Sequence, residues 1–339
     1  VPMMLANVLV RQRRWSHTVT GSPLRPADNA AVLQVVRSAA TAGSLRRAVA
    51  LRIGDAIPGY DDVMASPGEL GTLGVSEIPV GKPELDAAFD AIDDASARRL
   101  LDTLAARPGW RMQAGENALA SARLAVALEG LCARHKVSCG TINCHGELFR
   151  NNPKIGITAC LGMSLMGERG IPLSCTGDLP AGLAMLIAER LSGHALYCET
   201  YAPDLTRGTM LIASGGDGDP RWADAAGVQT IANTYYSGKR GAGTGLSFRL
   251  APGPATLVSL SPAGDGWRLA WATGEVTADG YDGLDGPNAM LRFDRAPVEA
   301  AASAWIASGA THHHALARGR LDAELAIVAA AAGLEAVSV

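Results

Sequence analysis

The sequence predicts an α/β protein in which a parallel-sheet, Rossmann-like domain is followed by an antiparallel β-barrel domain at the C-terminus. The chain has 339 residues, more than one ordinary domain holds, so we expect two or three domains. Between residues 46 and 207, apolar strand-like runs alternate with helical patterns, which favours a parallel sheet covered by helices. Beyond Gly208, short strands separated by Gly-, Pro- and Asp-rich turns indicate an antiparallel barrel or sandwich.

In the first part of the chain, short apolar or β-branched runs predict strands, and apolar residues spaced about 3.6 apart predict helices. One predicted helix ends at Gly170, which suits a left-handed C-cap, and the next begins near Asp178 and ends before Gly193. In chain order we expect strands at 1–10, 46–54, 75–80, 137–144, 172–176 and 195–201, and helices at 26–42, 67–74, 85–92, 96–106, 117–135, 158–169 and 178–191.

In the second part of the chain, the helical spacing of apolar residues mostly gives way to short strand-like runs. We expect strands at 209–214, 229–236, 246–251, 255–261, 267–276 and 290–293, then a helix at 297–308, a His-rich extended segment at 311–319, a helix at 321–332 and a strand at 335–339.

Composition excludes several classes of protein. The chain has 30 Lys and Arg against 33 Asp and Glu, a formal net charge of −3, whereas binding nucleic acid or an anionic membrane needs a basic face. No apolar run reaches the roughly 18 to 20 residues of a membrane span, and no signal peptide is recognisable, so we expect a cytoplasmic protein. All six cysteines lie between Cys132 and Cys198 without a Cys-x-x-Cys pair, so most are expected to be buried thiols.

Three segments carry most of the candidate chemistry: CTGDLPAGLAM at 175–185, LYCETYAPD at 196–204 and ATHHHALARG at 310–319. Carboxylates at strand ends, joined by histidines from a remote segment, commonly form metal or acid–base sites. Glu199 interrupts an apolar strand, which favours a functional role, whereas Asp178 is equally well explained as a helix N-cap. Adjacent histidines on an extended segment point to opposite faces, so at most alternate ones share a site.

Two further segments are weaker candidates. In NCHGE at 143–147, a nucleophile–base pair beside Cys144 is conceivable, with His145 and Glu147 as the partners. The glycine-rich SGKRGAGTG at 237–245 reads as a hairpin, and it can also be a flap that carries Lys239 or Arg240 to a substrate.

The order of these segments resembles the L-fucose and L-arabinose isomerase superfamily, over most of the chain from about residue 46 to the end. The resemblance also covers RRAVALRIGDAIPGYDDV and LGVSEIPV in the first half, GPATLVSLSPAGDGWRLAWATGEV in the predicted barrel, and the paired histidines of GATHHHALARG. It implies interconversion of aldoses and ketoses with a divalent metal, usually Mn²⁺, in active sites formed between subunits. A homo-oligomer, a trimer or hexamer, is therefore expected, with a small carbohydrate-like substrate.

Carried over to this chain, Glu199 stands at the family's second acidic metal position, and His312 or His313 stands at the late histidine ligand. Where the family has another acidic ligand this chain has Thr176, and Ser214 stands about where arabinose isomerases have a histidine. Only Asp178, Asp217 and Asp219 lie near enough in sequence to compensate, and without them one carboxylate and one imidazole make a weak metal site.

The resemblance also suggests the domain organisation: residues 1–45 as a remnant of a first α/β domain, 46–207 as an α/β domain, and 208–339 as a barrel domain with closing helices. We predict Glu199, Asp178 and His313 as catalytic residues, with Glu199 and His313 also as the Mn²⁺ ligands. The predicted substrate-binding residues are His312, Thr176, Lys239 and Arg240.

The leading hypothesis is an isomerase or epimerase that works through an enediolate, with assistance from the metal. A metal-free enzyme of the same fold, using a thiol such as Cys175 or Cys144, and a non-catalytic sugar-binding relative are the alternatives.

Overall fold

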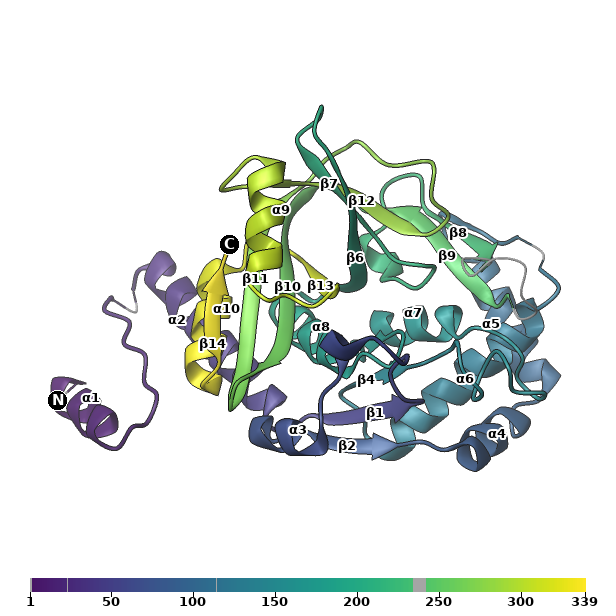
Figure 1. Cartoon of the computed structure of the whole chain (residues 1–339), viewed down its shortest axis with the longest axis horizontal. Coiled ribbons are helices and arrows are strands. Elements are labelled where there is room, and N and C mark those ends of the chain that lie inside the picture. The colour runs from purple at the N-terminus through teal and green to yellow at the C-terminus, as the bar shows by residue number, and fades with distance from the viewer. Residues whose placement is uncertain (1, 23, 114, 234–241) are drawn as a thin grey trace.

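The computed structural model describes residues 2–22, 24–113, 115–233 and 242–339, and these form two sheets with helices around and between them (Figure 1). The smaller sheet has four strands in the order β2-β1-β4-β5, and every pairing in it is parallel. Its strands are β1 (Val49–Ile53), β2 (Ser76–Pro79), β4 (Cys139–Ile142) and β5 (Leu173–Ser174). This sheet confirms the predicted α/β character, and the Rossmann-like description stays a prediction.

Helices connect these parallel strands, as crossover connections require. They are α3 (Pro67–Leu73), α4 (Lys82–Asp90), α5 (Asp94–Ala105), α6 (Ala118–His135) and α7 (Cys160–Glu168), with a short 3₁₀ turn η1 at Asp61–Val63. A sixth helix, α8 (Leu179–Ser192), leads from β5 to the larger sheet. Each of the six α-helices overlaps a predicted one.

Helix α8 lies between the two sheets (Figure 1). It contacts β4 and β5 of the smaller sheet on one side, and β6, β10 and β13 of the larger sheet on the other. Residues 179–188 are all buried, as expected for a helix with apolar neighbours all round. Helix α8 therefore begins at the boundary between the two sheets.

The larger sheet has ten strands in the order β14-β11-β10-β13-β6-β7-β12-β9-β8-β3. They are β3 (Trp110–Arg111), β6 (Ala195–Asp204), β7 (Thr209–Ala213), β8 (Val228–Ala232), β9 (Thr244–Arg249), β10 (Gly253–Ala263), β11 (Gly266–Val276), β12 (Pro287–Phe293), β13 (His313–Arg318) and β14 (Glu335–Ser338). A 3₁₀ turn η2 (Pro220–Trp222), α9 (Val298–Ala307) and α10 (Asp322–Ala332) complete this half.

The predicted antiparallel β-barrel is not confirmed, because this sheet is mixed. An additional pairing of β11 with β12 links six strands into a circuit of antiparallel pairs, from β11 through β10, β13, β6, β7 and β12. However, β14 joins β11, β9 joins β12 and β3 joins β8 in parallel. Strand β6, which the predicted boundary at 207/208 assigned to the preceding domain, belongs to this larger sheet; the domain division itself stays a prediction.

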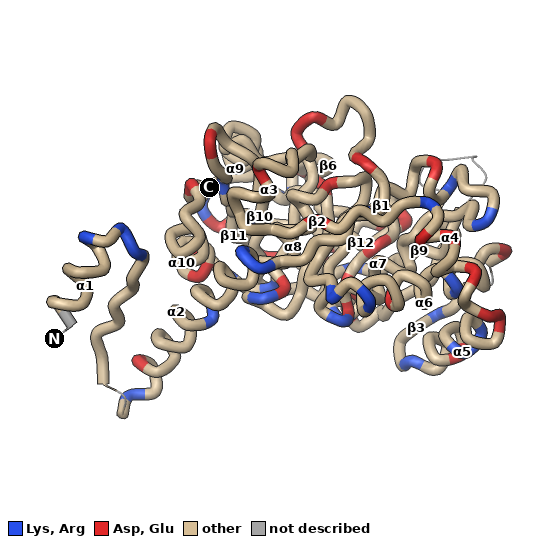
Figure 2. Tube along the Cα trace, turned by 90° about the horizontal axis from the view of Figure 1, so that it is seen from below, with Lys and Arg blue, Asp and Glu red and all other residues tan. Residues whose placement is uncertain are grey.

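The prediction of a strand at residues 1–10 is wrong. Pro2–Arg11 forms helix α1, which lies away from the body of the molecule in two views (Figures 1 and 2). Met3, Met4 and Leu5 are exposed, so no sheet partner stabilises an extended conformation, and Met, Leu and Ala favour a helix. Helix α2 (Pro26–Leu45), in contrast, lies where a helix was predicted and packs against α8 and α10.

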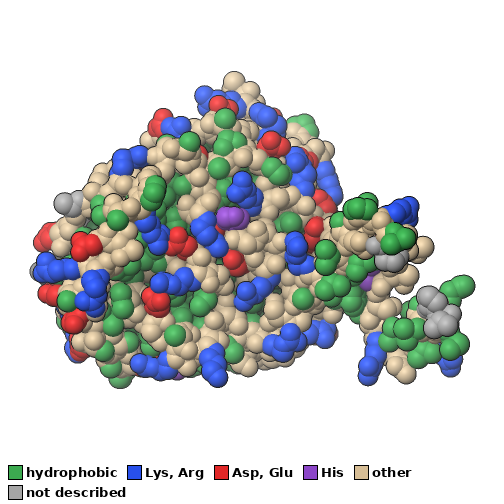
Figure 3. All heavy atoms as spheres, turned by 180° about the vertical axis from the view of Figure 1, so that it is seen from behind, with side chains coloured by type: hydrophobic (Ala, Val, Ile, Leu, Met, Phe, Trp, Pro, Cys, Tyr) green, Lys and Arg blue, Asp and Glu red, His purple; other side chains and the backbone are tan. Residues whose placement is uncertain are grey.

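Two surface properties bear on function. No helix in the described part of the chain combines the length and apolarity needed to cross a membrane. On the face shown in Figure 3, basic and acidic side chains are interspersed rather than separated into a single-sign patch.

Candidate active site

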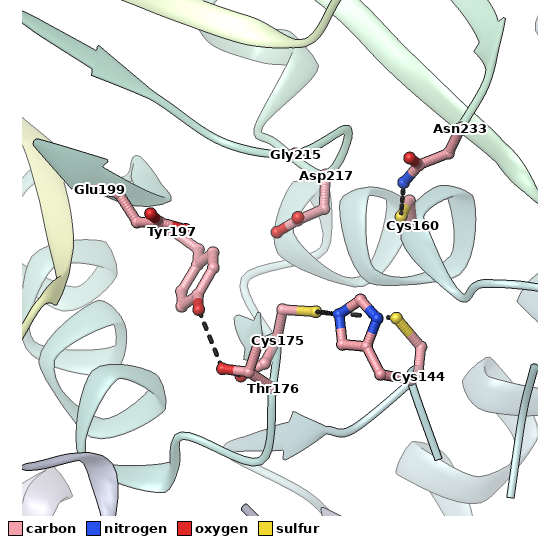
Figure 4. A pocket seen from close by; sticks show the side chains of 10 residues that line it. Cys144, Cys160, Cys175, Thr176, Tyr197, Glu199, Gly215, Asp217 and Asn233 are labelled. Atoms are coloured by element: carbon pink, nitrogen blue, oxygen red, sulfur yellow. Dashed lines mark hydrogen bonds between the residues drawn. The ribbon is translucent and has the colours of Figure 1, made fainter. Parts of the chain in front are cut away.

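A pocket lies at the boundary between the two sheets, at the carboxyl ends of β4 and β5 (Figure 4). The empty space within it, including the open solvent at its mouth, is about 360 Å³. Its walls come from the loops after β4 and β5, the start of α7, and β6 with the loop after β7. The lining residues are Cys144, His145, Cys160, Cys175, Thr176, Tyr197, Glu199, Gly215, Asp217 and Asn233.

The loop after β5 is a tight turn with two residues at positive φ, Thr176 (60°) and Gly177 (81°). A Cβ at Gly177 would lie 2.5 Å from the backbone of Ala56, so only glycine fits there. Thr176 is buried; its hydroxyl donates to the carbonyl of Cys175 at 2.7 Å and lies 3.2 Å from the Tyr197 hydroxyl. This position therefore offers the pocket a neutral, already bonded hydroxyl.

Asp178 caps α8 and also contacts His313. Its Oδ1 accepts the backbone N–H of Ala181 at 2.8 Å and so caps α8, while its Oδ2 lies 2.9 Å from Nδ1 of His313. Burial raises the pKa of the Asp178 carboxyl well above its usual range and lowers the pKa of His313 to about 4. The pair is therefore favoured in its uncharged form, with the Asp178 hydroxyl donating to Nδ1 and the ring proton on Nε2.

The cross-strand register brings His313 to Glu199. The two residues are partners in the antiparallel pairing of β13 with β6, and Nε2 of His313 lies 3.7 Å from Oε1 of Glu199. The Glu199 side chain is 34 % exposed and lines the pocket, whereas His313 is only 2 % exposed. Asp178, His313 and Glu199 thus form a line from the buried N-terminus of α8 to the pocket.

The other two histidines of the triplet lie elsewhere. His312 is not part of the pocket lining, because its imidazole binds the Asp62 carboxylate at 2.8 Å and is partly exposed. His314 is buried and accepts a hydrogen bond from Nε1 of Trp305 at 3.4 Å. His313 is the one member of the triplet that reaches Glu199.

Of the three aspartates that could compensate for Thr176, only Asp217 lines the pocket. It accepts a hydrogen bond from Ser214 at 2.8 Å, and burial raises its pKa to about 6. Asp219 instead pairs with Arg221 at 2.8 Å and with His194 at 3.0 Å. Lys239 and Arg240 lie outside the described residues.

Thiols on the opposite wall of the pocket form a group that the sequence analysis did not bring together. Sγ of Cys144 lies 3.7 Å from Sγ of Cys175, which lies 4.0 Å from Nε2 of His145 (Figure 4). The hydrogen bond with Cys175 lowers the pKa of Cys144, and the same bond together with burial raises that of Cys175. The sequence contains a feature that points to this pair, because Cys144 and Cys175 both stand at the ends of predicted strands that follow one another along the chain.

The residues present do not fit the Mn²⁺ site that the family resemblance implies. Mn²⁺ prefers carboxylate oxygens and imidazole, and Glu199 with His313 supplies one of each. Across the described ranges, no further Asp, Glu, His or Cys has a ligand atom close enough to both to complete a site. The two positions where the resemblance implies further ligands carry the hydroxyls of Thr176 and Ser214, each already hydrogen-bonded.

The comparison with protein families is consistent with part of this arrangement. Residues 194–335 match the model of the L-arabinose isomerase C-terminal domain. This part of the chain is sugar isomerase-like. The match contains Glu199, Asp217 and His313, whereas Asp178 and the loop thiols precede it. No curated protein matches the chain.

Proposed function

We propose that this chain is an isomerase or epimerase of a small polyhydroxylated substrate, working by proton transfer through an enediolate. The observation that carries the proposal is the contact of His313 with Glu199, backed by Asp178, inside a segment similar to a sugar isomerase domain. A proton-transferring carboxylate and a neutral hydrogen-bond donor for the carbonyl oxygen are the two groups that this chemistry needs.

Each residue has a distinct part in the reaction. The Glu199 carboxylate removes the proton from the carbon that bears a hydroxyl, and the electron pair of that C–H bond moves towards the neighbouring carbonyl. The Nε2–H of His313 points towards Oε1 of Glu199, 3.7 Å away. Its donation to the carbonyl oxygen, as that atom gains negative charge, requires the substrate oxygen to reach Nε2 beside Glu199, because His313 itself does not line the pocket. Asp178 is a positioning residue, because its hydrogen bond to Nδ1 directs the Nε2 proton towards the pocket.

The carbon and the face to which the proton returns determine the product. Delivery to the former carbonyl carbon, together with transfer of the neighbouring hydroxyl proton to the former carbonyl oxygen, interconverts an aldose and a ketose. Delivery to the original carbon from the other face, with the carbonyl restored, gives an epimer. We further propose a pentose such as L-arabinose as the first substrate to test, on the strength of the family match. Assistance by Mn²⁺ and a trimeric or hexameric assembly remain predictions from the resemblance.

The test is incorporation of deuterium from D₂O into a panel of aldopentoses, ketopentoses and aldohexoses, followed by NMR. We expect exchange at the carbon next to the carbonyl, and a loss of at least about 100-fold in the isosteric variant Glu199→Gln. Glu129→Gln is the control, because Glu129 is a half-exposed residue that pairs with Arg169 at 3.0 Å outside the pocket. Full exchange in Glu199→Gln, with the thermal stability unchanged, would contradict the proposal.

A further inference from the structure

We propose that Cys144, His145 and Cys175 form a binding site for a thiophilic divalent metal, Zn²⁺, on the wall of the pocket opposite Glu199. No other group of three or more His, Cys, Asp or Glu within the described ranges has its ligand atoms this close, all within 4.8 Å of one another. The argument rests on the position, the spacing and the chemistry of these three side chains.

The topology brings the three residues together. Cys144 and His145 follow β4, and Cys175 follows β5, its parallel neighbour in the sheet. Gly140 pairs with Leu173 and Thr141 with Ser174, so the chain leaves both strands at the same edge. Residues that leave adjacent parallel strands at their carboxyl ends are held close by the sheet and not by flexible segments.

The spacing matches tetrahedral coordination. Two thiolates bound to one Zn²⁺ at about 2.3 Å are ~3.8 Å apart, and a thiolate and an imidazole nitrogen are ~3.6 Å apart. The sulfur atoms of Cys144 and Cys175 lie 3.7 Å apart, and Nε2 of His145 lies 4.0 Å from Cys175. The sulfur pair already has the required separation, the imidazole is a few tenths of an ångström too far from Cys175, and the third pair, Cys144 and His145, lies within 4.8 Å.

The donor types select the metal. Thiolate and imidazole ligands favour Zn²⁺ over Mn²⁺, which prefers oxygen. Cys160, although it lines the same pocket, is not part of the group, because its sulfur accepts a hydrogen bond from the Asn233 amide at 2.9 Å and burial raises its pKa.

Three protein ligands leave the fourth position of a tetrahedral ion for water or substrate, as in catalytic zinc sites. Glu199 and Asp217 line the same pocket, so that position opens on the place proposed for the substrate. A Lewis-acid role for the ion rests on the proposed function, whereas the binding of Zn²⁺ itself does not.

The experiment uses the full chain, freed of metal by chelation under reducing conditions and titrated with Zn²⁺ against a chromophoric chelator. We expect one Zn²⁺ per chain, release of protons from the thiols on binding, and an affinity lower by about 100-fold or more in Cys144→Ser, Cys175→Ser and His145→Gln. Cys132→Ser is the matched control, because Cys132 is a buried thiol in α6 outside the pocket; its affinity should be unchanged.

Co²⁺ gives a readout that does not depend on variants. Thiolate ligands to Co²⁺ produce sulfur-to-metal charge-transfer absorption in the near ultraviolet, which a site of oxygen and nitrogen ligands lacks. The proposal is overturned if this band is absent, if Cys144→Ser binds Zn²⁺ as tightly as the wild type, or if the two sulfurs form a disulfide under the same reducing conditions. Zn²⁺ binding that survives in Glu199→Gln while deuterium exchange is lost separates this site from the proton-transfer function.

Discussion

Replacing Asp178 by Asn should leave the protein folded and active, although Asp178 is buried beside a predicted catalytic histidine. In the uncharged pair, Asp178 accepts from Ala181 through one oxygen and donates to His313 through the other. The Asn amide provides the same acceptor and the same donor, and Asn is as good an N-cap as Asp. The ring proton of His313 then stays on Nε2, so we expect a change in the free energy of unfolding below ~1 kcal/mol and activity within about tenfold of the wild type.

Asp178→Ala should behave differently, because it removes both hydrogen bonds. Loss of the N-cap costs about 1 kcal/mol, and leaving Nδ1 of His313 buried without a partner costs about 1–3 kcal/mol. We therefore expect Asp178→Ala to lower the free energy of unfolding by ~2–4 kcal/mol in urea denaturation, and to reduce deuterium exchange because the imidazole of His313 is no longer held.

The outcome for Asp178→Asn discriminates between two protonation states. If Asp178 were an anion that accepts from Nδ1–H, the Asn amide would force the opposite tautomer, and turnover would fall by about 10⁴-fold, as it does when the Asp of a catalytic triad is changed in this way. Such a fall, with the stability retained, would refute the uncharged pair. NMR of the imidazole nitrogens, assigned with His313→Gln, reports the tautomer directly.

Two further predictions concern the packing and the pH response of the site. A Cβ at Gly182 in α8 would lie 2.4 Å from the carbonyl oxygen of Gly140, so Gly182→Ala should destabilise the fold by ~1–3 kcal/mol in urea denaturation, whereas Gly130→Ala in α6, where a Cβ meets nothing within 4 Å, should stabilise it by up to ~1 kcal/mol. Equal effects of the two variants would contradict the close contact of α8 with β4. Burial raises the pKa of Asp217 to about 6 from its usual 3.8, so the folded state holds a proton that the unfolded state has released, and the stability falls as pH rises from about 4 to 7. Asp217→Asn, which still accepts from Ser214, should lose this slope and gain up to ~3 kcal/mol above pH 7; an unchanged pH profile of thermal unfolding would show that the carboxyl is not perturbed.

The sequence predicted most of the helices and strands, because apolar periodicity reports burial along one element. It failed at Pro2–Arg11, where a short apolar run has no period that separates a helix from a strand, and exposure instead of burial decides the outcome. It also failed to predict that β9 and β14 join the larger sheet in parallel, since the choice of partner depends on contacts between distant segments. The order of elements could be predicted, but the parallel pairings that make the larger sheet mixed could not.

The same distinction applies to the site. Glu199 could be identified because a charge interrupts an apolar strand, and its partner His313 because alternation on a strand allows one of two adjacent histidines to face it. Asp178 stayed ambiguous because the sequence cannot show that one carboxyl makes two contacts, to Ala181 and to His313. Cys144 and Cys175 are 31 residues apart, and only the register of β4 with β5 makes them neighbours.

The two sides of the pocket carry different donor atoms. This difference would let the chain depart from the ligand pattern that the resemblance implies and still bind a metal ion. At Thr176 in the pocket and at Ser214 outside its lining, hydroxyls occupy positions where the resemblance implies metal ligands, so the oxygen- and nitrogen-ligand set implied there is reduced to Glu199 and His313. These two can then act directly on protons. On the other wall, Cys144 and Cys175 supply soft donors at the ends of strands that the fold already holds in register. A site that exchanges oxygen ligands for thiolates would select Zn²⁺ over Mn²⁺ while the fold of the pocket stays the same. The affinities for Zn²⁺ and Mn²⁺ should therefore be measured in Cys144→Ser and in Glu199→Gln. The variant that loses affinity identifies the side of the pocket that binds the ion.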